Sequence, residues 1–107
     1  MEINEYQETV KNYIDYPTEL GPYYLILDMM GDVGKLSDKI KNTIKDEATM
    51  AKEDKILINI SLGDLMYHIS LIASSLGVSL EEILALNLRK LSLQKEKDVK
   101  EKTSIKK

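Results

Sequence analysis

The chain has 107 residues, a length that suits one compact domain around one core. Its 43% hydrophobic and 31% charged residues and its net charge of −3 are typical of a soluble globular protein and argue against a basic nucleic-acid-binding domain. The absence of cysteine excludes disulfides and thiolate metal sites. We find no apolar run approaching the roughly 20 residues of a membrane-spanning helix, and no secretory pattern at the N-terminus, so we expect a cytoplasmic protein.

The first predicted element is a helix of about three turns that begins at Asn4. Its apolar residues recur at three-to-four spacing, and it ends before residues 16–17, because proline disfavours helical geometry in the residue that precedes it. The apolar positions are Tyr6, Val10, Tyr13 and Ile14.

A long second helix is predicted over residues 22–47. Its apolar stripe consists of Leu27, Met30, Val33, Leu36, Ile40 and Ile44, with Asp32 and Lys35 on other faces. Gly31 and Gly34 each cost roughly 1 kcal/mol relative to alanine inside a helix. Their presence suggests close packing at a helix crossing or the approach of a ligand. The lysines of this helix form either a local anion site or a solvated face.

The third and fourth helices are separated by a short turn. Residues 56–76 are apolar nearly all round, which predicts a central helix or one shared with another subunit, and Gly77 marks its end. Ser79 and Glu82 have the spacing of a capping box that opens the fourth helix. Beyond Gln94 the chain is charged, so we expect a helical domain over residues 1–94 and a disordered tail over 95–107.

These elements predict an all-α fold of four helices that form a bundle. Helices this apolar need a partner chain to cover them, so we expect a homodimer or homotetramer that associates through its helices. Neither a membrane nor a nucleic acid is expected as a partner.

Two segments resemble the motifs of the MazG-like all-α nucleoside triphosphate pyrophosphohydrolases, particularly the short phage and bacterial forms. Residues 31–36 read GDVGKL, where many short members have GExGE, and residues 61–64 read SLGD, where the family has ELGD. Tyr67 stands at the family's aromatic position, and residues 87–91, NLRKL, are similar to its NLxKL. The resemblance covers about residues 4–94 and implies a bundle fold that binds nucleotides.

In that family four carboxylates hold Mg²⁺, which bridges the phosphates and activates water. Carried over to this chain, Asp32 and Asp64 stand at two of the ligand positions, whereas Lys35 and Ser61 replace the other two. The family's arginine after NLxKL is Gln94 here. The metal-binding motifs are therefore degenerate, and no cofactor is expected unless the site has been rebuilt.

An ammonium group at a metal-ligand position repels a divalent ion and attracts a phosphate. Lys35 therefore predicts a pocket that binds a nucleotide without hydrolysing it. A weaker Mg²⁺ site formed by Asp28, Asp32 and Asp64 remains open as an alternative, because Asp28 lies one helical turn before Asp32.

Several further residues are candidate contacts to a ligand. His68 lies four residues after Asp64 and is either a hydrogen-bond donor to that aspartate or to a ligand, or a packed core histidine. Tyr16 and Tyr67 are candidates for stacking on a base, against a structural role in the core. Asn87 and Lys90 either contact the base, sugar or phosphate or lie on an exposed helix face.

The function predicted first is that of a catalytically impaired MazG-like protein that sequesters a nucleotide or a nucleotide-derived signal. In a phage, such a protein would act in the host cytoplasm as an anti-defence sponge. The first alternative is an active Mg²⁺-dependent pyrophosphohydrolase that cleaves an NTP to NMP and pyrophosphate, with Asp32 and Asp64 in the catalytic site. The second is a non-catalytic helical interaction module.

Overall fold

The computed structural model describes residues 1–14, 18–45 and 51–105. Its elements in chain order are α1 (Ile3–Val10), the 3₁₀ turns η1 (Lys11–Tyr13) and η2 (Thr18–Leu20), α2 (Pro22–Lys45), α3 (Lys52–Ser75) and α4 (Leu80–Ile105). Every regular element in these ranges is helical, which confirms the predicted all-α class.

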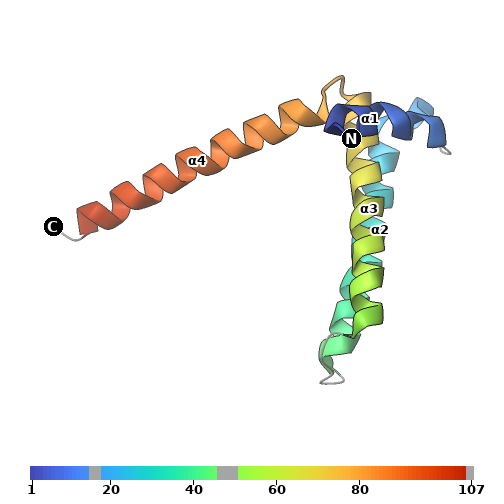
Figure 1. The fold of residues 1–107 in the computed structure, drawn as a ribbon, viewed down its shortest axis with the longest axis horizontal. Coiled ribbons are helices and arrows are strands. Elements are labelled where there is room, and N and C mark those ends of the chain that lie inside the picture. Colours follow the sequence, from blue (N-terminus) through green and yellow to red (C-terminus); the bar gives the residue numbers. More distant parts are fainter. Residues whose placement is uncertain (15–17, 46–50, 106–107) are drawn as a thin grey trace.

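The four α-helices do not close into one bundle within a single chain. Figure 1 shows α2 and α3 side by side as a long hairpin, with α1 across the end of the hairpin where α3 stops. From that same end α4 projects away from the other helices. The Cα radius of gyration is 18.5 Å, against about 13 Å for a compact domain of this length. The expected four-helix bundle is thus a three-helix body with a projecting fourth helix.

The core lies where α1 crosses the α2–α3 hairpin. Val10, Leu25 and Leu71 supply one buried side chain each from the three helices. Three partly buried side chains pack around them: Tyr6, Tyr67 and Ile72. The amphipathic spacing predicted for α1 is confirmed, since Tyr6 and Val10 both face this core.

A buried glutamine joins α1 to the turn between α3 and α4. Gln7 is 5% exposed, and its Nε2 donates to the Val78 carbonyl at 2.9 Å and to Ser74 Oγ at 3.2 Å. Its Oε1 accepts the backbone N–H of Leu80 at 2.8 Å. The glutamine therefore satisfies backbone groups on both sides of the turn, where no helix ladder can reach them.

The turn itself follows the sequence pattern. Gly77 has φ +74°, a left-handed conformation that glycine adopts without steric cost. Ser79 Oγ accepts the backbone N–H of Glu82 at 3.1 Å, as a serine N-cap does. The predicted end of α3 and the predicted start of α4 are both confirmed.

The apolar stripe predicted for α2 is wrong in its first half. Leu25 is 1% exposed and packs in the core, whereas Leu27 and Met30 are 73% and 51% exposed. Asp32, expected on another face, is half-buried. Helix α2 carries apolar residues on two sides, and the side that contacts α3 is the one that also carries the partners of a buried histidine.

The tail expected to be disordered is helical. Helix α4 continues past Gln94 to Ile105, and Gln94 Nε2 donates to Asp98 Oδ1 one turn later at 3.1 Å. The segment contains no glycine or proline, and its lysines, glutamates and glutamine are good helix formers. The high charge of this stretch led to the prediction of a tail, but charged residues do not interrupt a helix.

Helix α3 begins earlier than the predicted Ile56 and is longer. The Asp54 carboxylate accepts the backbone N–H of Ala51 at 3.1 Å and so caps the new start. Contrary to expectation, this 24-residue helix is long and apolar enough to cross a membrane by length and composition, with a mean hydropathy of 1.5 over its most apolar window. That window contains few charges, and the apolar core helix of a soluble protein meets the same criterion.

Candidate functional site

A buried histidine lies between the two helices that carry the motifs. His68 comes from α3 and is 6% exposed. Its Nε2 lies 2.8 Å from Asp28 Oδ2 on α2. Its Nδ1 lies 2.9 Å from the backbone carbonyl oxygen of Asp64 and 3.4 Å from Asp32 Oδ2. The imidazole therefore connects both motif segments.

This geometry selects the doubly protonated form of the imidazole. Both ring nitrogens face oxygen acceptors, and a neutral ring would turn one lone pair toward an acceptor. Desolvation by burial lowers the pKa of His68. The hydrogen bonds to Asp28 and to the Asp64 carbonyl, with the negative charges of Asp28 and Asp32, outweigh it, and the pKa is raised above its usual 6.5.

Asp28 and Asp32 belong to a row that continues with two lysines. Positions 28, 32, 35 and 39 follow the four-and-three spacing of one helix face, and Lys35 and Lys39 are exposed. Because α2 and α3 form an antiparallel hairpin, residues that follow Asp32 run alongside those that precede His68. Along this row, the two carboxylates are followed by the ammonium groups of Lys35 and Lys39, which lie nearer the loop end of the hairpin.

The second motif contributes its backbone more than its side chains. His68 was considered either as packed or as a donor to Asp64, and it is both packed and bonded to the Asp64 carbonyl oxygen rather than to its carboxylate. The Asp64 side chain is exposed. Ser61 Oγ donates to the Leu57 carbonyl at 3.0 Å within the same helix. The histidine ring therefore lies between the Asp32 carboxylate and the Asp64 backbone.

The helical glycines are not required by packing inside one chain. A Cβ atom added at Gly31, Gly34 or Gly63 would meet nothing within 4 Å. Gly63 lies in a shallow, largely apolar depression next to Tyr6 and Met66. Of the two explanations considered for Gly31 and Gly34, close packing is not found within the single chain, and the approach of a ligand stays a prediction.

Of the two aromatic candidates, Tyr67 has structural partners. The Tyr67 hydroxyl donates to the Tyr13 carbonyl at 2.8 Å, and its ring stands edge-on to His68 with centroids 5.4 Å apart. Tyr67 thus holds the histidine in place and ties α3 to the segment after α1. Tyr16 lies outside the described residues.

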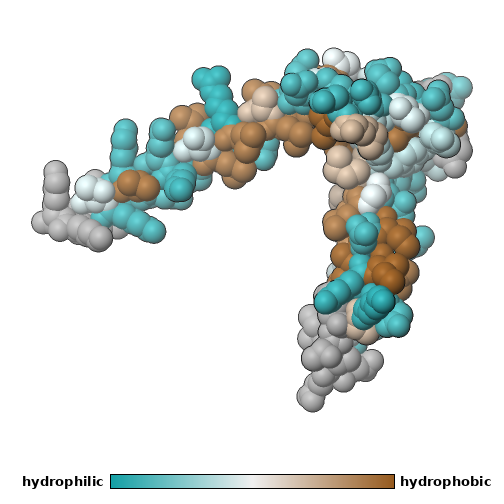
Figure 2. Space-filling model, in the orientation of Figure 1, coloured by the Kyte–Doolittle hydropathy of each residue, from teal (hydrophilic) through white to brown (hydrophobic). Residues whose placement is uncertain are grey.

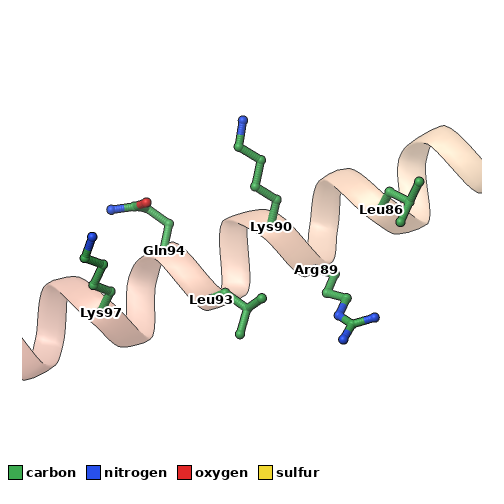
Figure 3. Close-up of a pocket in the computed structure, with 6 residues that line it drawn as sticks. All are labelled: Leu86, Arg89, Lys90, Leu93, Gln94 and Lys97. Atoms are coloured by element: carbon green, nitrogen blue, oxygen red, sulfur yellow. The ribbon is translucent and has the colours of Figure 1, made fainter.

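The two candidates from the fourth helix are separated from this cluster. Asn87 and Lys90 are exposed on α4, which extends away from the hairpin. Figure 3 shows the shallow surface beside Lys90, where Lys90 and Arg89 point to different sides of the helix. Within one chain these residues do not close a pocket around His68.

The side chains fit a magnesium ion poorly. Within residues 1–14, 18–45 and 51–105, no group of three or more His, Asp or Glu side chains is arranged to hold a metal. Asp28 and Asp32 direct oxygens toward the imidazolium of His68, so these oxygens already face a cation. In the three-aspartate alternative of Asp28, Asp32 and Asp64, an ion would share the first two carboxylates with the histidine.

Sequence reasoning missed the pair of Asp28 and His68. The available signal was the spacing of Asp28 and Asp32, which places two carboxylates on one face of an apolar helix. A lone histidine on the adjoining helix is the natural cation for such a pair.

Comparisons with known proteins give one distant likeness. The chain is 28% identical over 80 residues to the "Gene 37 protein" of Mycobacterium phage L5. The aligned residues make up 74% of this chain and 70% of that protein. No model of a known protein family matches the chain. No solved structure matches it either.

Proposed function

We propose that the chain is a catalytically impaired MazG-like protein that binds a nucleotide or a nucleotide-derived signal. The observation that carries the proposal is the contact of the two motif segments through His68, with Lys35 on the same row of α2 as its two aspartate partners. The order and spacing of the motifs add the link to nucleotides.

Phosphate is the group that this arrangement favours. Lys35 and Lys39 are exposed on the hairpin and able to meet an anion, whereas the nearby carboxylates of Asp28 and Asp32 face the ring of His68. An ammonium binds phosphate as a point charge. The polar Asp64 side chain, exposed on α3, is available to a sugar hydroxyl or base.

Water activation has little support in this chemistry. A divalent ion would have to displace the imidazolium from Asp28 and Asp32 and tolerate the ammonium of Lys35. Binding without turnover is therefore the expected activity, and a phage origin, suggested by the gene 37 likeness, suits a sponge for host signalling nucleotides in the cytoplasm.

Calorimetric titration without metal tests the proposal. The ligand panel contains nucleoside triphosphates, cyclic dinucleotides and cyclic ADP-ribose derivatives. We expect saturable binding of at least one ligand, weakened tenfold or more in Lys35→Glu. Lys41→Glu is the matched control, because Lys41 is an exposed lysine on a different side of the same helix.

Two results would overturn the proposal. Hydrolysis of an NTP to NMP and pyrophosphate with Mg²⁺, lost in Asp64→Ala, would establish an active enzyme. Absence of binding across the panel would leave a helical interaction module.

A further inference from the structure

Helix α4 is exposed along nearly its whole length. Every residue from Glu81 to Thr103 is exposed, and its contacts with α1 are made by its first turn. Most helical stability in proteins comes from packing of an apolar face. A 26-residue helix that projects unsupported therefore implies a surface that covers it.

One side of this helix carries an apolar stripe. Leu84, Leu88 and Leu91 follow one another at four-and-three spacing and are 47%, 69% and 56% exposed. Val99 continues the same side eleven residues after Leu88. Figure 2 shows brown, apolar surface along the part of α4 nearest the body.

The charges along this side differ between its two ends. Glu81 flanks the stripe in the first turn, and α1, which contacts that turn, adds the exposed Glu5 and Glu8, of which Glu8 pairs with Lys11. Lys95 and Lys102 lie seven and fourteen residues after Leu88, on the side of the stripe. Asp98 lies on this side too, seven residues after Leu91, whereas Glu96 and Glu101 lie on other sides. The first end is therefore acidic, and the far end carries two lysines and one aspartate on the side of the stripe.

We propose that α4 pairs antiparallel with α4 of a second copy of this chain. With the two-fold axis between residues 87 and 88, Leu88 lies beside the partner's Leu88, and Leu84 lies opposite the partner's Leu91. Glu81 then comes within one residue, about 1.5 Å along the axis, of the level of the partner's Lys95. A C₂ contact of this kind is self-complementary.

The charges decide against a parallel pair. Parallel α4 helices would bring Glu81 against Glu81 and Lys95 against Lys95, which like-charge repulsion disfavours. In the antiparallel pair, the partner's Lys102 extends beyond the start of α4 toward the glutamates of α1. The same pairing covers the leucines of both copies.

Sedimentation of the full chain tests whether this face mediates association. We expect the wild type to be a dimer or larger assembly and Leu88→Asp to become monomeric, because it buries two carboxylates at the axis. Leu86→Asp is the matched control, since Leu86 is 67% exposed on α4 but lies off the stripe. It should retain the pair. A monomeric wild type would overturn the proposal, and so would loss of the dimer in Leu86→Asp alone. A monomeric wild type that binds anionic vesicles would assign the leucine stripe of α4 to a lipid surface.

Cysteine cross-linking tests the direction of the pair without relying on a disruptive variant. The chain has no cysteine, so each introduced thiol is unique. Equimolar Leu84→Cys and Leu91→Cys proteins should form a mixed disulfide in preference to either homodimer. Preferential formation of both homodimers would establish the parallel pair and overturn the inference.

A charge exchange tests the register. Glu81→Lys and Lys95→Glu should each weaken the dimer roughly threefold to tenfold, and the double variant should recover most of the affinity. Failure of the double variant to recover would overturn the proposed register.

Discussion

Replacing His68 with leucine tests whether the buried imidazolium holds α2 against α3. The substitution removes the contact to Asp28 at 2.8 Å and the bond to the Asp64 carbonyl at 2.9 Å. Hydrogen bonds to charged groups contribute about 1.5–3 kcal/mol each. The Asp28 side chain is 54% exposed and regains water when its partner is lost, so we expect a combined loss of about 2–3 kcal/mol.

Thermal and urea unfolding at fixed protein concentration measure this loss. For a domain of about 100 residues the expected fall in melting temperature is roughly 10–20 °C. The variant should remain helical by circular dichroism, because leucine is a good helix former. An unfolding free energy within about 0.5 kcal/mol of the wild type at pH 6.5 would refute the reasoning.

The pH dependence supplies a second, independent readout of the same contact. The pKa of His68 is raised in the folded chain, so the folded state holds its proton more tightly than the unfolded state. The stabilisation is fully present below the unfolded pKa of about 6.5 and is lost as pH rises through the folded pKa. The difference in unfolding free energy between the wild type and His68→Leu should therefore become smaller above pH 6.5. A gap that widens would contradict the assignment of an imidazolium.

Substitutions at three positions test, by urea denaturation, the contacts where α1, α3 and α4 meet. Gln7→Leu should cost about 2–3 kcal/mol, because it leaves the Leu80 N–H and the Val78 carbonyl without their partner; an unchanged midpoint would show that water replaces the amide. Gly77→Ala should cost about 1–2 kcal/mol, since its φ of +74° crowds a Cβ atom. Ser79→Ala should cost about 1 kcal/mol through loss of the cap, whereas Ser79→Asp should retain it.

Local chemistry predicted the end of α3 and the start of α4. Gly77 and Ser79 act through their own backbone and immediate neighbours, so their roles can be recognised without knowing the fold. The apolar face of α2 could not be identified in the same way. Leu25 and Leu27 lie on different sides of one helix, and only the packing of α3 decides which side is buried.

The site shows the same division between local and long-range information. The resemblance implied that the two motifs lie close together, but the pair of Asp28 and His68 spans 40 residues and depends on the register of α2 against α3. The sequence pattern pointed to Asp64, four residues before His68, and the structure uses its carbonyl oxygen. A disordered tail was predicted over residues 95–107 from their charge, but residues 95–105 contain no helix breaker and are helical in the structure.

The contacts of Gln7 couple the position of α1 to the direction of α4. The first turn of α4 is anchored to two amides of α1, because Gln7 accepts the Leu80 N–H and Asn4 accepts the Glu81 N–H. The helix is 26 residues long, about 39 Å. A tilt of about 10° at the anchor would sweep the far tip through about 7 Å. A small displacement of α1 would therefore produce a larger displacement at the C-terminal end of α4.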